Sequence, residues 1–259
     1  MPPWPYPLWL AHRGAGKLAP ENTLAAFRLG ASFGYRAFEC DVKLSADDQP
    51  FLLHDAELER TSNGQGVAGT LPWAELSKLD AGSWHGPAYA GEPLPRLEAI
   101  AAFVRSNGLA LNIEIKPTPG AEPHTGRVVA SAAQKLWQGD TLLPLLSSFR
   151  PDALAGARQA APELPRALLL ESLWPGCLDM AASLGCVAVV CHHPLMNAAL
   201  LTELHARGLH GCVYTVNDAA RAGELLALGV ASIITDAVDQ LSPAIAAAGM
   251  AASAPSAAS

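Results

Sequence analysis

The sequence predicts an α/β fold, specifically a (β/α)8 TIM barrel with a small insertion after the second strand. Apolar segments of strand length alternate with amphipathic helical segments along nearly all of the 259 residues. The strand segments are continuous apolar runs, which is typical of parallel strands covered on both faces. A doubly wound open sheet is the alternative, but no glycine-rich phosphate loop follows the first strand. About eight strand–helix units in a chain of this length favour the barrel.

The first part of the chain contains the first two strands of this barrel. Strands are expected at residues 8–12 and 37–44, with a helix at 24–34 between them, because Gly34 is a typical helix stop. A second extended segment, residues 50–55, is counted with strand 37–44 as one continuing element.

An excursion follows these strands. Residues 56–95 are rich in glycine and proline and are longer than a usual loop, so they are expected to form the insertion, with a short helix at 73–79. The barrel and its insertion together should form one domain, residues 1–250.

The rest of the chain repeats a helix followed by a strand. The expected helix and strand pairs are 97–107 with 110–115, 125–136 with 142–149, 151–160 with 166–170, 178–184 with 187–191, 198–207 with 211–216, and 219–228 with 231–235. A last helix is expected at 240–248. The small-residue tail at 251–259 should be flexible.

Composition narrows the range of partners and compartments. The net charge of −7 argues against nucleic acid or an anionic membrane surface as a partner, and no apolar run approaches the length of a membrane span. The start of the chain does not resemble a signal peptide. The five cysteines are odd in number and lack a CxxC spacing, which favours buried thiols in a reducing compartment. We therefore expect a cytoplasmic protein without stable membrane association, either a monomer or a homodimer.

Strand 37–44 places two carboxylates in an otherwise apolar segment. Side chains alternate between the faces of a strand, so Glu39 and Asp41 share one face and the apolar side chains beside them share the other. Two adjacent buried carboxylates repel each other unless a proton or a cation lies between them. Pairing with Lys43 or an arginine is the structural alternative. A divalent cation is the better explanation if a third carboxylate joins them.

Polar residues collect at the ends of the predicted strands, where barrel enzymes carry their catalytic groups. Glu114 supplies the third carboxylate, and Lys116 shares its face of the strand. His12 and His54 arrive from different strands, as a general base and a general acid would. Arg13 offers a planar fork suited to phosphate. Two further polar residues end the last strands: Asn217 and Asp236.

The ligand types indicate which metal this cluster would bind. Three carboxylates without paired cysteine or histidine ligands favour a hard cation over zinc. We expect one divalent cation, Mg²⁺ or Ca²⁺, with Mn²⁺ as a further candidate.

Long motifs extend this interpretation over nearly the whole chain. The run His-Arg-Gly-Ala-Gly-Lys-Leu-Ala-Pro-Glu-Asn-Thr at residues 12–23 is followed by specific motifs at residues 39–42, 54–55, 58–66, 79–84, 94–98, 111–117, 147–149, 214–217 and 229–236. With these motifs in this order, the chain resembles the glycerophosphodiester phosphodiesterases of bacterial cytoplasmic type.

The resemblance implies a fold and a set of roles. It implies a (β/α)8 barrel with an insertion after the second strand. It implies metal ligands at Glu39, Asp41 and Glu114. It also implies an acid/base pair at His12 and His54, and phosphate contacts at Arg13 and Lys116.

Several residues near the motifs carry secondary expectations. Tyr214 stands where the family usually has tryptophan, which bears on substrate fit rather than on reaction type. Trp84, on a glycine-flanked loop, joins it as a candidate substrate contact. Asn22 is expected to cap helix 24–34, and Glu21 to help hold Arg13 or a group on the metal.

The expected function is metal-dependent hydrolysis of small glycerophosphodiesters to sn-glycerol 3-phosphate and an alcohol, by two-histidine acid/base catalysis. A phospholipase acting on lysolipids or phosphoinositides is one alternative, although the chain lacks a basic or amphipathic membrane-facing stretch. A non-catalytic barrel that binds phosphoesters is the other, but such a protein should have lost one of the five central residues.

Overall fold

The computed structural model of the protein describes residues 3–241, and it contains a closed barrel of parallel strands. Neighbouring strands pair in parallel around the full circle, and the last strand pairs with the first. In order around the barrel the strands are β1 (Trp9–Ala11), β2 (Ala37–Leu44), β4 (Ala110–Ile115), β5 (Leu145–Ser148), β6 (Arg166–Leu170), β7 (Ala188–His192), β8 (His210–Tyr214) and β9 (Ser232–Thr235). The predicted (β/α)8 fold is confirmed.

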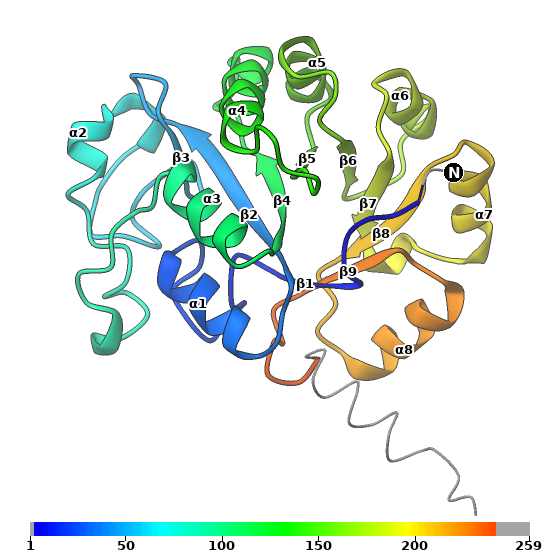
Figure 1. The fold of residues 1–259 in the computed structure, drawn as a ribbon, viewed down its shortest axis with the longest axis horizontal. Coiled ribbons are helices and arrows are strands. Elements are labelled where there is room, and N and C mark those ends of the chain that lie inside the picture. Colours follow the sequence, from blue (N-terminus) through cyan, green and yellow to red (C-terminus); the bar gives the residue numbers. More distant parts are fainter. Residues whose placement is uncertain (1–2, 242–259) are drawn as a thin grey trace, which may run out of the picture.

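Helices surround the strands on the outside of the barrel (Figure 1). They are α1 (Leu24–Ser32), α3 (Leu97–Ser106), α4 (Glu122–Leu136), α5 (Pro151–Ala160), α6 (Cys177–Ser183), α7 (Ala198–Ala206) and α8 (Ala219–Leu228). Three of them begin at side chains that accept a hydrogen bond from the first turn: Thr23, Asn197 and Asp218. Such caps satisfy amide groups that have no partner within the helix. No helix of residues 3–241 is long and apolar enough to cross a membrane.

The segment after β2 corrects one expectation. Residues 50–55 do not continue the carboxylate strand, because β3 (Pro50–Leu52) turns back and pairs antiparallel with β2, Leu52 opposite Val42. β2 extends beyond the level of Asp41, and the returning chain brings Leu53 back to that level, where its amide donates to the Asp41 carbonyl oxygen at 3.1 Å. The hairpin therefore delivers His54, the next residue, to the carboxylate cluster.

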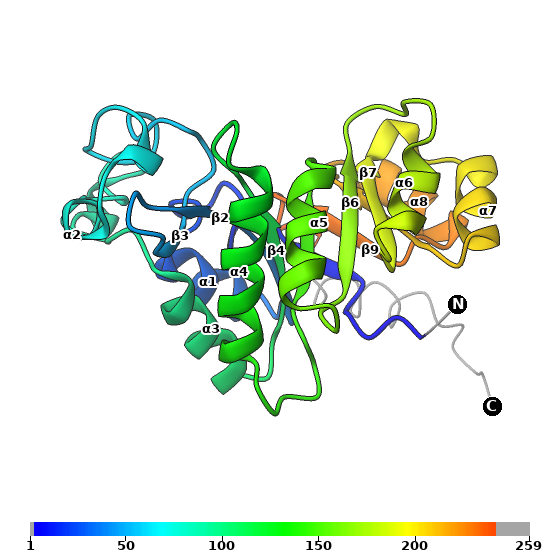
Figure 2. The same ribbon diagram turned by 90° about the horizontal axis from the view of Figure 1, so that it is seen from above.

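The insertion lies beside this hairpin, at the end of the molecule away from α6, α7 and α8 (Figure 2). It contains η1 (Ala68–Thr70), α2 (Trp73–Leu76) and η2 (Pro87–Tyr89). Its own small core forms around buried Phe51, Leu58 and Leu76. Helix α2 ends before the expected residue 79 because the amides of Lys78 and Leu79 bond three residues back, which tightens the last turn.

Other strand and helix boundaries differ from the predicted ones for local reasons. Strand β5 begins at Leu145 rather than at residue 142, since Pro144 has no amide hydrogen for the sheet. Helix α4 begins earlier than expected, with Pro123 in its first turn, a position that tolerates proline. The helix expected at 240–248 and the tail expected at 251–259 lie outside the described residues, apart from residues 240 and 241.

Two hydrophobic layers of the described residues pack on the two sides of the strands. One layer fills the space between strands and helices. The other fills the interior near the starts of the strands, where Ala37 of β2 and Ala110 of β4 face inward and Tyr6 closes the end. Because side chains alternate, the next inward positions along β2 after Ala37 are Glu39 and Asp41. The interior thus changes from apolar to acidic along the strands.

Candidate active site

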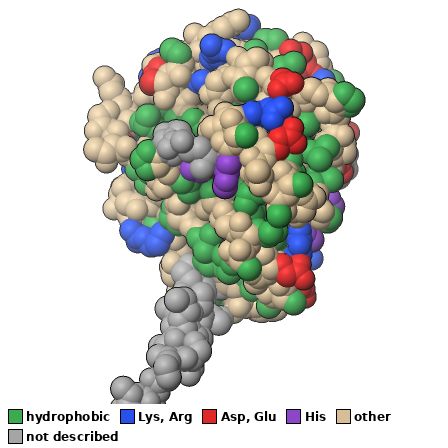
Figure 3. All heavy atoms as spheres, turned by 90° about the vertical axis from the view of Figure 1, so that its right-hand side faces the viewer, with side chains coloured by type: hydrophobic (Ala, Val, Ile, Leu, Met, Phe, Trp, Pro, Cys, Tyr) green, Lys and Arg blue, Asp and Glu red, His purple; other side chains and the backbone are tan. Residues whose placement is uncertain are grey.

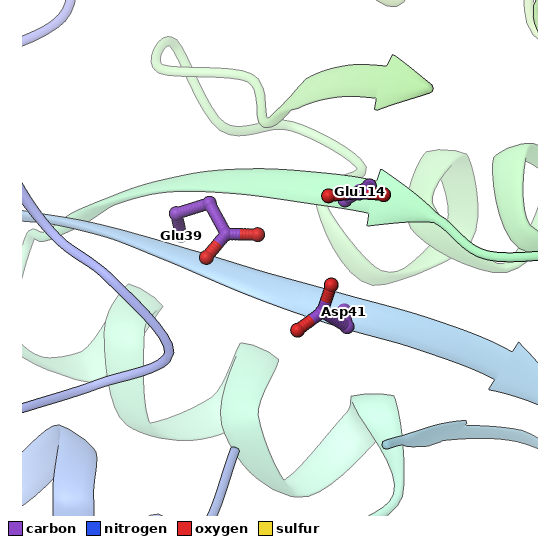
Figure 4. A group of neighbouring side chains, drawn as sticks. All are labelled: Glu39, Asp41 and Glu114. Atoms are coloured by element: carbon purple, nitrogen blue, oxygen red, sulfur yellow. The ribbon is translucent and has the colours of Figure 1, made fainter. Parts of the chain in front are cut away.

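Three carboxylates meet inside the barrel, as predicted. Glu39 and Asp41 come from β2, Glu114 comes from β4, and Asp41 and Glu114 lie opposite each other in the parallel register. One oxygen from each side chain lies within 4.8 Å of the other two, and all three residues are buried (Figure 4). The strand alternation inferred from the sequence is the cause of this cluster.

The carboxylates carry unequal charge because their neighbours differ. Burial, with the charges of Asp41 and Glu114, raises the pKa of Glu39 well above its usual value. Burial and Asp41 raise the pKa of Glu114 to about 7. Burial also acts to raise the pKa of Asp41, but Arg13 and Lys116 outweigh it and hold that pKa at about 2. The raised pKa values show that the charged carboxylates are insufficiently neutralised by Arg13 and Lys116, so an additional positive charge would stabilise the cluster.

The cluster fits a divalent cation. Glu39 Oε1 and Asp41 Oδ1 are buried and have no hydrogen-bond partner, which is costly for carboxylate oxygens in a protein interior. Three oxygen donors suit a hard cation. Asp41 pairs with Arg13, Nε to Oδ2 at 3.1 Å, and with Lys116 at 3.7 Å. Among the described residues, Lys43 forms no ion pair with either carboxylate of β2, whereas the alternative pairing with an arginine is observed for Asp41 with Arg13.

His12 is held by a carboxylate from the opposite end of the chain. Its Nδ1 lies 2.6 Å from Asp236 Oδ1. Asn217 fixes that carboxylate, since its Nδ2 donates to Asp236 Oδ2 at 3.1 Å. The other ring nitrogen, Nε2, lies 3.7 Å from Glu39 Oε2. Asp236 therefore directs His12 Nε2 toward the carboxylate cluster.

His54 repeats this arrangement with a carboxylate next to it in the sequence. Its Nδ1 lies 2.8 Å from Asp55 Oδ1. Burial lowers the pKa of His54, although the nearby charge of Asp41 acts in the opposite direction. Both histidines thus bind a carboxylate through Nδ1 and keep Nε2 for other contacts.

Arg13 and Asn22 hold the carboxylates from the loop between β1 and α1. Both have positive φ angles, 52° and 59°, which are unusual for residues other than glycine and mark local strain. The Arg13 amide donates to Glu39 Oε2, and the Arg13 guanidinium donates to Glu21 Oε1 at 2.9 Å. The expectation that Glu21 helps to hold Arg13 is confirmed.

The expected role of Asn22 is corrected. Thr23, not Asn22, caps α1, by accepting a hydrogen bond from the Ala26 amide. Asn22 instead binds Asp41 twice: its Nδ2 donates to Asp41 Oδ2 at 2.8 Å, and its Oδ1 accepts from the Asp41 amide at 3.0 Å. The left-handed backbone of Asn22 turns its side chain away from the helix and toward β2.

A cavity of about 140 Å³ opens over the cluster. Its lining residues are His12, Arg13, Glu39, His54, Asn112, Glu114, Lys116, Phe149, Leu169, Tyr214, Thr215 and Ile234. One side is polar and charged, whereas Phe149 and Tyr214 form an aromatic pair on the other, with ring centroids 5.7 Å apart. Such a cavity suits a small ligand that has an anionic end and an apolar portion.

Trp84 does not line this cavity. Its side chain is partly exposed in the insertion, its indole donates to the Ala81 carbonyl, and its ring contacts His85. A substrate contact by Trp84 stays a prediction.

Comparison with known proteins identifies the relationship. The model of the glycerophosphoryl diester phosphodiesterase family matches residues 12–240. The chain belongs to this family. YhdW of Bacillus subtilis (strain 168) is 34% identical over 237 residues, 89% of this chain and 94% of that protein. The glycerophosphodiester phosphodiesterase of the same organism is 28% identical over 249 residues, 90% of this chain and 84% of that protein.

A solved structure of similar fold extends the comparison. The structure of an Oleispira antarctica phosphodiesterase in complex with the product sn-glycerol-3-phosphate is 32% identical and has a TM-score of 0.86. The match covers 93% of this chain and 97% of that one.

Two site residues of this glycerophosphoryl diester phosphodiesterase family member were not assigned roles from the sequence. Asp55 and Asp236 each hold a histidine, and a signal existed for both. Asp55 follows His54 directly, and Asp236 ends the last strand, which pairs with β1. Gly16 allows close approach there, since a Cβ on it would lie 2.0 Å from the Asp236 carbonyl oxygen.

Proposed function

We propose that this chain hydrolyses glycerophosphodiesters to sn-glycerol 3-phosphate and an alcohol. The observation that carries the proposal is the pairing of two carboxylate-held histidines with a buried three-carboxylate cluster at one cavity. The similar Oleispira antarctica phosphodiesterase, which binds sn-glycerol-3-phosphate as product, supports this substrate class.

Glu39, Asp41 and Glu114 would hold one divalent cation, Mg²⁺ or Ca²⁺, with Mn²⁺ as a further candidate. The unpartnered buried oxygens of Glu39 and Asp41, and the nearness of Glu114, support this assignment. When bound, such a cation supplies Lewis-acid activation of the oxygens around phosphorus.

The cationic side chains position the phosphoryl group. Arg13 and Lys116 line the cavity beside the carboxylates, and Lys116 lies 3.0 Å from Glu114. Both would donate to the phosphoryl oxygens, on which negative charge increases as the attacking oxygen approaches.

His12 and His54 move the protons. One Nε2 accepts the proton of the attacking hydroxyl, and the other donates a proton to the oxygen of the leaving alcohol. Asp236 and Asp55 keep the Nδ1 atoms occupied, so that each ring presents the same nitrogen to the substrate. Tyr214 and Phe149 would contact the apolar part of the substrate from the opposite wall.

The test is the release of sn-glycerol 3-phosphate from glycerophosphocholine and glycerophosphoethanolamine in the presence of Mg²⁺, Ca²⁺ or Mn²⁺. We expect turnover that chelation abolishes, and a loss of at least ~10²-fold in kcat for His12→Ala and for His54→Ala. Full activity in either variant would remove that histidine from the mechanism.

The same assay separates the alternatives. Release from lysolipids or phosphoinositides, without release from soluble diesters, would indicate a phospholipase. Tight binding of diester with no release from any substrate would indicate a non-catalytic barrel. A single domain at residues 1–250, a cytoplasmic location, the absence of stable membrane association and a monomeric or homodimeric state stay predictions.

A further inference from the structure

Arg60, in the insertion, connects two carboxylates that belong to different parts of the site. Its Nη1 and Nη2 atoms each lie 2.8 Å from a Glu21 oxygen, which makes a two-pronged contact. Its Nε donates to Asp55 Oδ2. All three guanidinium nitrogens of Arg60 therefore donate hydrogen bonds to the two carboxylates. The single ammonium nitrogen of lysine cannot reproduce this planar geometry.

Each of these carboxylates in turn holds a residue of the cavity. Glu21 Oε1 accepts from Arg13 Nη1 at 2.9 Å, and Asp55 Oδ1 lies 2.8 Å from His54 Nδ1. A continuous chain of charge-assisted hydrogen bonds thus runs from Arg13 through Glu21, Arg60 and Asp55 to His54. Its ends come from two separate loops, after β1 and after β3, and Arg60 is the link between them.

Electrostatics support the same connection. The hydrogen bond from Arg60 is the largest influence lowering the pKa of Asp55, and it outweighs burial there. Without Arg60, the Asp55 carboxylate would lose a charged partner and would be free to rotate toward solvent, away from His54. Glu21 would keep Arg13 as its remaining guanidinium partner and could draw it away from Asp41.

We propose that Arg60 is a positioning residue through which the insertion sets the orientation of His54 and Arg13 together. The insertion then contributes to the reaction, because it supplies Arg60. This side chain fixes the orientation of the proton-transfer residue, His54, relative to the phosphate-binding residue, Arg13. The inference rests on the proposed function for the meaning of these two roles.

The experiment compares wild type with Arg60→Ala, Asp55→Ala and the double variant. We expect Arg60→Ala to lose about tenfold or more in kcat with an unchanged Tm. The double variant should lose less than the product of the two single losses, because both changes break the contact to His54, whereas only Arg60→Ala also removes the contact to Glu21 and Arg13. Guanidinium ion at millimolar concentration should restore part of the Arg60→Ala activity, since the Arg60 side chain is 45% exposed and its site can be reached from solvent.

A matched control is available on the barrel surface. Arg105 contacts Asp140 through two nitrogens with similar exposure, away from the cavity, so Arg105→Ala should keep wild-type kcat and show no response to guanidinium. Arg60→Lys keeps the charge and removes the fork. A folded Arg60→Lys enzyme with wild-type kcat would overturn the proposal, as would additive losses in the double variant.

A measurement without turnover separates this inference from the proposed function. The ¹⁵N NMR signals of the His54 ring report whether Nδ1 keeps its hydrogen bond to Asp55. We expect that bond to be weakened in Arg60→Ala and retained in Arg105→Ala. An unchanged His54 spectrum would refute the inference even in an active enzyme. Absence of sn-glycerol 3-phosphate release by wild type would refute the proposed function alone.

Discussion

At the scale of single residues, carboxylates set the orientation of the two histidines and of the arginine at the site. Asp236 and Asp55 bind the Nδ1 atoms of His12 and His54, and Glu21 binds Arg13. None of these three carboxylates belongs to the cluster of Glu39, Asp41 and Glu114. The site therefore contains two kinds of acidic residue: three with oxygens facing one another, and three that orient other side chains.

Asp236 offers a direct test of orientation. In Asp236→Asn the amide can present the wrong atom to His12 Nδ1, so the ring would adopt the other tautomer or turn. We expect kcat to fall by roughly 10²-fold or more with little change in KM, measured by steady-state kinetics. Asp179→Asn, at an exposed acidic residue of α6, should leave both constants unchanged. Wild-type kcat in Asp236→Asn would show that the hydrogen bond has no catalytic role.

Glu114 gives the metal-free protein a defined pH dependence. Its pKa is raised from 4.5 to about 7 in the folded chain, so the folded state favours the protonated form. The contribution of this group to the free energy of unfolding is fully present below pH 4.5 and is lost as pH rises through about 7. Its size is roughly 1.4 kcal/mol for each unit by which the folded-state pKa exceeds the unfolded-state pKa.

Thermal unfolding measures this effect. We expect the Tm of metal-free protein to fall between pH 5 and pH 8, and the increase in Tm on adding Ca²⁺ or Mg²⁺ to be larger at pH 8 than at pH 5. Glu114→Gln should flatten the metal-free curve. Identical curves for wild type and Glu114→Gln would contradict the assignment.

At the scale of elements, α4 and α5 pack through two glycines. A Cβ on Gly126 of α4 would lie 1.9 Å from the Ala153 carbonyl oxygen, and a Cβ on Gly156 of α5 would lie 2.2 Å from the Pro123 carbonyl oxygen. The two backbones therefore contact each other directly. Glycine in a helix usually costs stability relative to alanine, so its use here reflects the close approach.

Alanine substitutions separate these two effects. Gly126→Ala should destabilise the fold by about 1–3 kcal/mol, because the helices must move apart. Gly223→Ala on α8 has no neighbouring atom within 4 Å and should be neutral or stabilise by up to about 1 kcal/mol. Urea unfolding of both variants gives the comparison. Equal stability of the two would mean that α4 and α5 can separate without cost.

The observed helices and strands also show how much of the fold could be predicted from the sequence. The bounds of β2, β4, β6, α5 and α8 match the prediction residue for residue, because each is an apolar or amphipathic run between clear polar or glycine boundaries. The direction of β3 was missed because an apolar run has no information on whether its partner is parallel. Asn22 was misassigned since its positive φ depends on Asp41, which is distant in the sequence. The orienting role of Asp236 likewise depends on a residue distant in the sequence, His12, whereas Asp55 directly follows the histidine that it orients.

At the scale of the whole molecule, the candidate catalytic residues of the described chain, residues 3–241, lie around one cavity. Figure 3 shows charged side chains of both signs dispersed among uncharged ones on one face. With a net charge of −7, we expect the chain to bind an anionic substrate through the local positive charges of Arg13 and Lys116, which line the cavity.

The arrangement of the cavity predicts the nucleophile. A glycerophosphodiester has a hydroxyl next to its ester oxygen, and a well-aligned neighbouring group is equivalent to a concentration of ~10⁵ M or more. With His12 and His54 at one cavity, we expect this hydroxyl to attack phosphorus first and expel the alcohol, after which water opens the cyclic glycerol phosphate. A deoxy analogue lacking that hydroxyl should lose several orders of magnitude in kcat. Turnover of the analogue near the rate of glycerophosphocholine would identify water as the nucleophile.

The apolar packing inside the barrel, at the starts of the strands, has a consequence for the kinetics. Tyr6 and the inward-facing alanines close the barrel at the starts of the strands, so the cavity opens on one side. Under the proposed function, substrate would enter and both products would depart through the same opening, and sn-glycerol 3-phosphate would leave a position that the next substrate molecule needs. We expect sn-glycerol 3-phosphate to inhibit competitively against the diester, whereas the released alcohol should inhibit weakly or noncompetitively. Initial-rate measurements with each added product would reveal this order of departure, and noncompetitive inhibition by sn-glycerol 3-phosphate would contradict it.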